Sequence, residues 1–171
     1  MTERLYYDDP YKREFDARIT RLEMRDGRPH VWLDRSAFYP TSGGQPFDTG
    51  TLGSRIVEEV LEDEHGDVVH VIAVTPGAGE SEPDDAGALG VGTDVHGTID
   101  WRRRFDHMQQ HTGQHVLSAA IDRLFDVRTV SFHLGAGTST IDVARELTAR
   151  EIAAAEDDAN RVVWEDRPVT I

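Results

Sequence analysis

Residues 102–125 read RRRFDHMQQHTGQHVLSAAIDRLF, and they mark the change from strand patterns to a helical pattern. This stretch contains no proline, and its apolar residues at 117, 121 and 124 keep helical spacing. We therefore expect a helix over 102–125. Gly113 lies inside it and costs about 1 kcal/mol relative to alanine, so we interpret Gly113 as a close packing contact.

On the N-terminal side of this helix, short and partly alternating runs predict strands. FDARITRLEM (15–24) and HVWL (30–33) flank Asp26-Gly27, a pair that favours a hairpin turn. RIVEEVLE (55–62) and VVHVIAV (68–74) predict a second hairpin, although RIVEEVLE also fits a helical turn.

A boundary is expected between these hairpins and the helix. Residues 76–93 are rich in glycine, proline and acidic side chains, which is typical of a linker. Residues 95–100 (VHGTID) then predict one more strand.

After the helix, two further strands and a second helix are expected. VRTVSFHL (127–134) and TSTIDV (138–143) surround a Gly-Ala-Gly turn, and Thr148 with Glu151 forms a capping box that opens a helix to about Trp164. The predicted inner face of that helix consists of Ile152, Ala155, Ala159 and Val162. Pro168 ends it, and because PVTI resembles the start of a strand, we expect the chain to be a truncated form of a longer domain.

Composition limits the class of protein. A chain of 171 residues, 38% hydrophobic and 29% charged, is typical of one soluble globular domain or two small ones. No run approaches the roughly 20 apolar residues of a membrane helix, and MTERLYYDDPYKREF lacks the apolar core of a secretory signal. With no cysteine, disulfides and thiolate metal sites within this chain are excluded, and a cytoplasmic location is the default.

The net charge of −14 would repel a polyanion, so binding of nucleic acid would have to be local. Solubility or a saline cytoplasm is the alternative explanation of this acidity.

Three histidines share one face of the expected helix. His107, His111 and His115 are four residues apart, and each step of four rotates a helix by only about 40°. Zinc prefers roughly four ligands, of which the pair in H-T-G-Q-H would supply two, and His133 lies in a strand that could face the helix. Exposed or hydrogen-bonded core histidines are the alternative. Thr112 stands where a metalloprotease would carry its glutamate.

A loop follows the first strands, at 38–50, and reads FYPTSGGQPFDTG. Gly43 and Gly44 permit positive φ and let backbone N–H groups approach a ligand closely, and the side chain of Gln45 can donate or accept a hydrogen bond. Two interpretations stay open, a tight turn between strands and a loop that borders a binding pocket.

Taken together, FYPTSGGQPFDTG (38–50), HMQQHTGQHVLSAA (107–120) and SFHLGAGTSTIDV (131–143) resemble the alanyl-tRNA editing proteins of the AlaX type. These are free-standing relatives of the editing domain of alanyl-tRNA synthetase. The resemblance spans residues 15–167. It implies an α+β fold, with a β-barrel-like N-terminal domain over 1–94 and an editing domain with a histidine-bearing helix over 95–171.

The resemblance also implies an activity, the zinc-dependent deacylation of alanine-specific tRNA that carries serine or glycine. The family's Zn²⁺ would be held by His111 and His115 and by a Cys-x-x-x-His pair expected beyond residue 171, with His107 and His133 as substitute ligands. Thr41, Gly43, Gly44 and Gln45 match the loop near the editing pocket. His133 matches a polar pocket position, unless the alignment is shifted by one residue to Phe132.

Contact with tRNA needs positive charge, and the sequence Trp101-Arg102-Arg103-Arg104 is the one dense basic cluster. We expect Arg102 and Arg103 to hold phosphates while Trp101 stacks on a base. An arginine face that pairs with the chain's own carboxylates is the alternative.

Two other functions stay open beside the deacylase. One is a catalytically incomplete editing fold that binds tRNA or a protein partner. The other is a zinc hydrolase that acts on a different ester or amide. The sequence predicts no oligomeric state.

Overall fold

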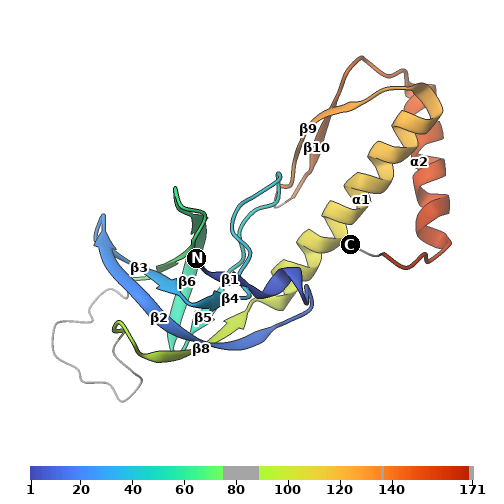
Figure 1. Cartoon of the computed structure of the whole chain (residues 1–171). Coiled ribbons are helices and arrows are strands. Elements are labelled where there is room, and N and C mark those ends of the chain that lie inside the picture. The colour runs from blue at the N-terminus through green and yellow to red at the C-terminus, as the bar shows by residue number, and fades with distance from the viewer. Residues whose placement is uncertain (75–88, 136, 170–171) are drawn as a thin grey trace. The chain divides into compact units, whose positions relative to one another are not determined.

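The computed structural model describes residues 1–74, 89–135 and 137–169 (Figure 1). Its strands are β1 (Glu3–Arg4), β2 (Glu14–Arg25), β3 (Arg28–Leu33), β4 (Arg35–Ser36), β5 (Gly50–Leu52), β6 (Arg55–Glu62), β7 (Val68–Ile72), β8 (Asp94–Ile99), β9 (Thr129–His133) and β10 (Thr140–Val143). Its helices are the 3-10 helix η1 (Leu5–Tyr7) and the α-helices α1 (Trp101–Phe125) and α2 (Ala149–Trp164). The chain divides into two compact units, Met1–Arg104 and Phe105–Ile171, and each is described by itself.

A closed barrel forms the first unit. Its strands follow the order β2-β3-β7-β6-β5-β8, and each neighbouring pair is antiparallel. Along β2, the buried Phe15, Ala17 and Ile19 alternate with exposed residues, so one side of the strand faces the barrel core. The barrel and the two α-helices confirm the predicted α+β class and the barrel-like N-terminal part.

The predicted Asp26-Gly27 hairpin is confirmed. Asp26 (φ 50°) and Gly27 (φ 74°) both have positive φ, as the two central residues of a type I′ turn require. Arg25 and Arg28 then pair across β2 and β3. RIVEEVLE is the strand β6, so the helical alternative for this run is wrong.

The boundary between the two units lies after Arg104, later than the predicted boundary at residue 94. The reason is that β8 completes the barrel, because it pairs with β2 on one side and with β5 on the other. The predicted linker at 76–93 lies largely outside the described residues.

The second unit contains the β9–β10 hairpin, α2 and α1 from Phe105 onward. Its small core centres on the buried Ile121, Val127 and Ala155. The predicted capping box is confirmed, because Thr148 Oγ1 accepts from the backbone N–H of Glu151 while the Glu151 carboxylate accepts from that of Thr148.

Two packing expectations were wrong. Ile152, predicted to face inward, is 53% exposed, because the buried face of α2 is narrower and centres on Ala155. Gly113 is not a close packing contact, because a Cβ placed there would meet no atom within 4 Å. Neither described helix is long and apolar enough to cross a membrane.

Candidate functional site

The loop at 38–50 contains a tight turn with two glycines at its tip. Ser42 and Gln45 exchange two backbone hydrogen bonds, of 3.1 and 2.9 Å, around Gly43 (φ 56°) and Gly44 (φ 81°). These angles favour glycine because most other L-residues are strained in the left-handed region. The turn interpretation is therefore confirmed as local geometry, and a Cβ placed at Gly43 would meet no atom within 4 Å.

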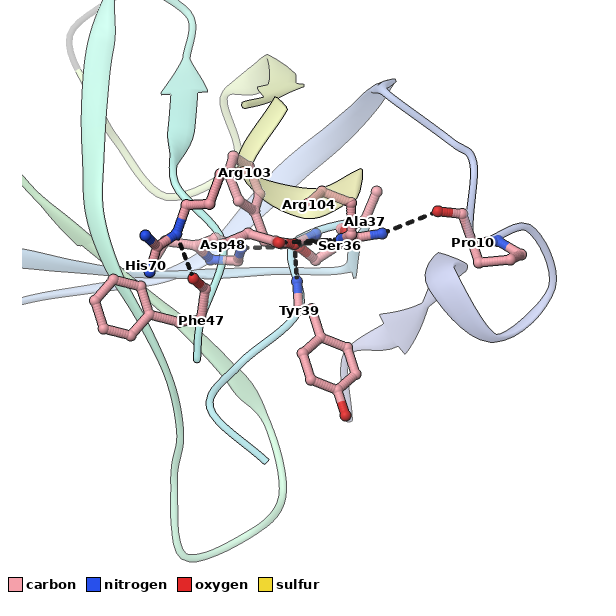
Figure 2. A network of polar contacts seen from close by, with 10 residues as sticks. Pro10, Ser36, Ala37, Tyr39, Phe47, Asp48, His70, Arg103 and Arg104 are labelled. Atoms are coloured by element: carbon pink, nitrogen blue, oxygen red, sulfur yellow. Dashed lines mark hydrogen bonds and ion pairs between the residues drawn. The ribbon is translucent and has the colours of Figure 1, made fainter. Parts of the chain in front are cut away.

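A buried ion pair fixes the other end of this loop (Figure 2). The carboxylate of Asp48 is fully buried and accepts from Arg104 Nε at 2.9–3.0 Å, from Arg104 Nη2, and from the Tyr39 N–H at 2.7 Å. Arg104 also donates to the carbonyl oxygens of Ala37 (2.6 Å) and Pro10 (3.1 Å). We call Asp48 and Arg104 the buried clamp, because it ties both ends of the loop to the first turn of α1.

The other arginines of the basic cluster differ from Arg104. Arg103 donates from Nε to the Phe47 carbonyl at 2.9 Å, and its guanidinium lies 5.3 Å from the centre of the Phe47 ring. Arg102 is exposed. Of the three arginines, Arg104 follows the alternative interpretation, pairing with a carboxylate, while Arg102 and Arg103 remain predicted phosphate contacts.

A second buried polar group, Ser36 and His70, lies in the same barrel (Figure 2). His70 Nδ1 lies 3.0 Å from the Val31 carbonyl oxygen, which can only accept, so this nitrogen carries the proton. Ser36 Oγ then donates to His70 Nε2 at 2.8 Å. Burial lowers the pKa of His70 to about 4, so the imidazole is neutral and structural at neutral pH.

The predicted metal ligands lie together on α1. The rings of His111 and His115 stack with centroids 5.0 Å apart and planes 18° apart. Burial lowers the pKa of His111, and the neighbouring His115 lowers it further. A neutral imidazole is the form that binds a metal ion, so this pair is chemically suited to supply two ligands.

Further ligands for a metal ion are not gathered beside this pair. Within the residues that the structure describes, no group of three or more His, Asp or Glu side chains is placed to hold a metal ion. The buried His107 lies on the same helix, and His133 is exposed at the end of β9. The ring of Phe132 lies 6.2 Å from the ring of His111. Phe132 is the residue that replaces His133 if the alignment with the family is shifted by one position.

The predicted site residues therefore fall into two groups. Thr41, Gly43, Gly44 and Gln45 lie at the turn in the first unit, where Thr41 is exposed and Gln45 is 5% exposed. His111 and His115 lie in the second unit. Each group is locally ordered by its own contacts.

Sequence reasoning missed the buried clamp and the Ser36–His70 pair. Asp48 stood within the quoted loop and Arg104 within the arginine triplet, but they are 56 positions apart. The sequence offered one signal for the clamp, the carboxylate of Asp48 close to the Gly43-Gly44 turn.

Comparison with known proteins gives relatives along the whole chain, although no family model matches. The chain is 38% identical over 177 residues to alanyl-tRNA editing protein AlaX-M of Methanosarcina acetivorans, covering 100% of this chain and 69% of that protein. It is 37% identical over 174 residues to AlaX-L of Pyrococcus horikoshii, again over 100% of this chain but only 41% of the relative. It is also 36% identical over 176 residues to the alanine–tRNA ligase of Pyrococcus abyssi, where it matches 18% of the enzyme.

Proposed function

Because the chain belongs to the family of alanyl-tRNA editing proteins, we propose that it hydrolyses alanine-specific tRNA carrying serine or glycine. The observation that carries this proposal is the stacked pair of His111 and His115 on α1, within a chain similar to editing proteins along its full length. We propose the cytoplasm as its place of action.

The reaction is the hydrolysis of one ester. A water oxygen bonds to the carbonyl carbon of the amino acid, and the bond from that carbon to the ribose oxygen breaks. The water's protons pass to the ribose oxygen and to solvent, so the products are the free amino acid and tRNA with its terminal hydroxyl restored. The negative charge that develops on the carbonyl oxygen needs hydrogen-bond donors nearby.

The glycine turn is assigned to substrate contact. The bare backbone at Gly43 and Gly44 allows close approach to the ester, and the exposed hydroxyl of Thr41 can bond the hydroxyl of a serine substrate. A site that bonds a hydroxyl selects serine over alanine, which lacks it, and would protect tRNA correctly charged with alanine. This contact does not select glycine, which has no hydroxyl either. Gln45 and His133 are assigned as further polar contacts to the substrate.

His111 and His115 are assigned as zinc ligands. When bound, zinc polarises a carbonyl and lowers the pKa of a bound water. The two imidazoles would hold the ion from one helix face, and the burial that lowers the pKa of His111 favours the neutral ring that binds a metal ion. Within the described residues, no group of three or more His, Asp or Glu side chains is placed to complete this site.

The test combines metal content with deacylation. We expect about one zinc per chain by elemental analysis, as for a single structural or catalytic site, and release of serine or glycine from mischarged tRNA but not of alanine. The variant His111→Ala/His115→Ala should lose both. The control His65→Ala alters an exposed histidine of the first unit and should keep both. Full deacylation by the double variant would overturn the metal-dependent proposal.

The second candidate is a catalytically incomplete module that binds tRNA. Retained binding of tRNA without zinc and without deacylation would support this candidate. Hydrolysis of small esters or amides but not of any charged tRNA would instead indicate a hydrolase of different specificity.

A further inference from the structure

An exposed aromatic and basic surface lies in the first unit, apart from the glycine turn. It consists of Tyr11, Lys12, Arg13, Trp101 and Arg102, and we call it the Tyr11–Trp101 platform. The two ring centroids lie 5.7 Å apart, and the Arg13 guanidinium lies 4.3 Å above the Trp101 ring. Tyr11 is 59% exposed, so part of its ring is available to a ligand.

Backbone contacts hold this platform in place. The Ile99 N–H donates to the Arg13 carbonyl at 2.8 Å, which joins the segment before β2 to the end of β8. Arg104 donates to the Pro10 carbonyl at 3.1 Å, and the Tyr11 N–H donates to Asp9 Oδ1 at 2.9 Å. Because these contacts order the backbone before a ligand arrives, less entropy is lost on binding.

The charges of the platform are unusual for this chain. Most arginines of this acidic protein pair with carboxylates, as Arg18 does with Asp94 and Arg145 with Glu151. In the described parts of the chain, by contrast, no ion pair involves Lys12, Arg13 or Arg102.

Of the carboxylates near the platform, Asp9 and Asp100 accept hydrogen bonds from the chain's own backbone, and Glu14, next to Arg13, lies 4.0 Å from His96 Nε2. Asp9 accepts from the Tyr11 N–H, and Asp100 accepts from the Arg103 N–H at 3.2 Å as the N-cap of α1. Free cations beside an exposed aromatic ring match a ligand with phosphates and stackable bases.

We propose that the Tyr11–Trp101 platform binds single-stranded RNA, with one base stacked on the Tyr11 ring and the Arg13 guanidinium and the flanking phosphates on Lys12 and Arg102. The identification of this RNA with the unpaired end of tRNA that bears the amino acid rests on the proposed function. Double-stranded RNA is disfavoured, because its bases are stacked on one another and cannot reach an aromatic ring.

The experiment measures binding of two fluorescently labelled RNAs without an attached amino acid to the full chain, a single-stranded oligonucleotide and a blunt-ended duplex of two complementary strands. We expect the single strand to bind more tightly. Tyr11→Leu should weaken its binding by roughly 5- to 150-fold, as removal of one stacking partner does. Lys12→Gln and Arg102→Gln should each reduce the slope of log affinity against log salt by about 0.7.

Arg55→Gln is the matched control, because Arg55 is an exposed barrel arginine outside the platform, and this variant should bind like the wild type. Arg13→Gln provides a second test if Tyr11→Leu folds poorly by circular dichroism. Equal affinity for the duplex, or an equal loss in Arg55→Gln, would overturn the platform.

Because neither RNA carries an amino acid, failure of the platform and failure of the proposed function can be told apart. Tyr11-dependent binding without deacylation would support the platform and overturn the proposed function. Deacylation with an unchanged KM for tRNA, together with unchanged binding of the single strand by Tyr11→Leu, would overturn the platform alone.

Discussion

His70 should make the barrel sensitive to acid by an amount that can be isolated in one variant. Burial lowers its pKa from 6.5 in the unfolded chain to about 4 in the folded one. Below pH 6.5 the unfolded chain therefore binds a proton that the folded chain does not, and the free energy of unfolding falls until the pH reaches about 4. Between pH 7 and pH 5 this amounts to about 2 kcal/mol, and by pH 4 to about 3 kcal/mol.

The assay is urea denaturation of the full chain and of His70→Gln at pH 7, 6 and 5, followed by the fluorescence of the buried Trp32. Glutamine keeps a donor and an acceptor at this position but does not titrate. The wild type should lose about 2 kcal/mol more than the variant between pH 7 and pH 5. The control His65→Gln, at an exposed position, should follow the wild type.

Equal pH slopes for the wild type and His70→Gln would refute the reasoning. So would a His70 resonance that titrates near its ordinary value in the folded protein by NMR. Either result would mean that water or a charge reaches the imidazole that Ser36 and Val31 enclose.

Asp48→Asn and Arg104→Gln should each cost about 3–5 kcal/mol in chemical denaturation, because each leaves one half of the buried clamp uncompensated. Asp48→Leu/Arg104→Met should cost less than the sum of the two single changes, and simple additivity would contradict the coupling. Gly44→Ala should lower the free energy of unfolding by about 1–2 kcal/mol, because Gly44 has a φ of 81°. Gly113→Ala in α1 should raise it by about 1 kcal/mol, because alanine favours the helix and a Cβ there meets no atom within 4 Å. Thermal denaturation measures both changes, and two changes of the same sign would contradict the assigned backbone conformations.

Local signals in the sequence predicted most of the elements. The Asp26-Gly27 turn and the Thr148–Glu151 capping box act within a few residues, so their physics is readable from the chain alone. The uncertainty over RIVEEVLE also has a local cause. Val57 and Val60 are both buried although they are three positions apart, because a register shift between Val57 and Glu59 interrupts the alternation of β6.

The barrel-like part was expected from the family resemblance, but the order of its strands and the buried clamp could not be read from local patterns, because both depend on contacts between distant segments. The strand at 95–100 was recognised, but nothing within it shows that β2 and β5 are its neighbours. In the same way, no local pattern distinguishes Arg104, which is buried on Asp48, from the exposed Arg102 two positions earlier. The histidine pair was found because its two members lie one helical turn apart.

The closed barrel has a consequence for self-association. Each of its strands has a neighbour on both sides, so the barrel presents no open row of backbone N–H and C=O groups to another chain. The β9–β10 hairpin differs, because in the part of the chain that the structure describes it pairs two strands without a third, and Val130 on β9 is 69% exposed. Aggregation by addition of strands would therefore involve this hairpin and not the barrel. A charged side chain on its exposed face, as in Val130→Lys, would suppress such aggregation.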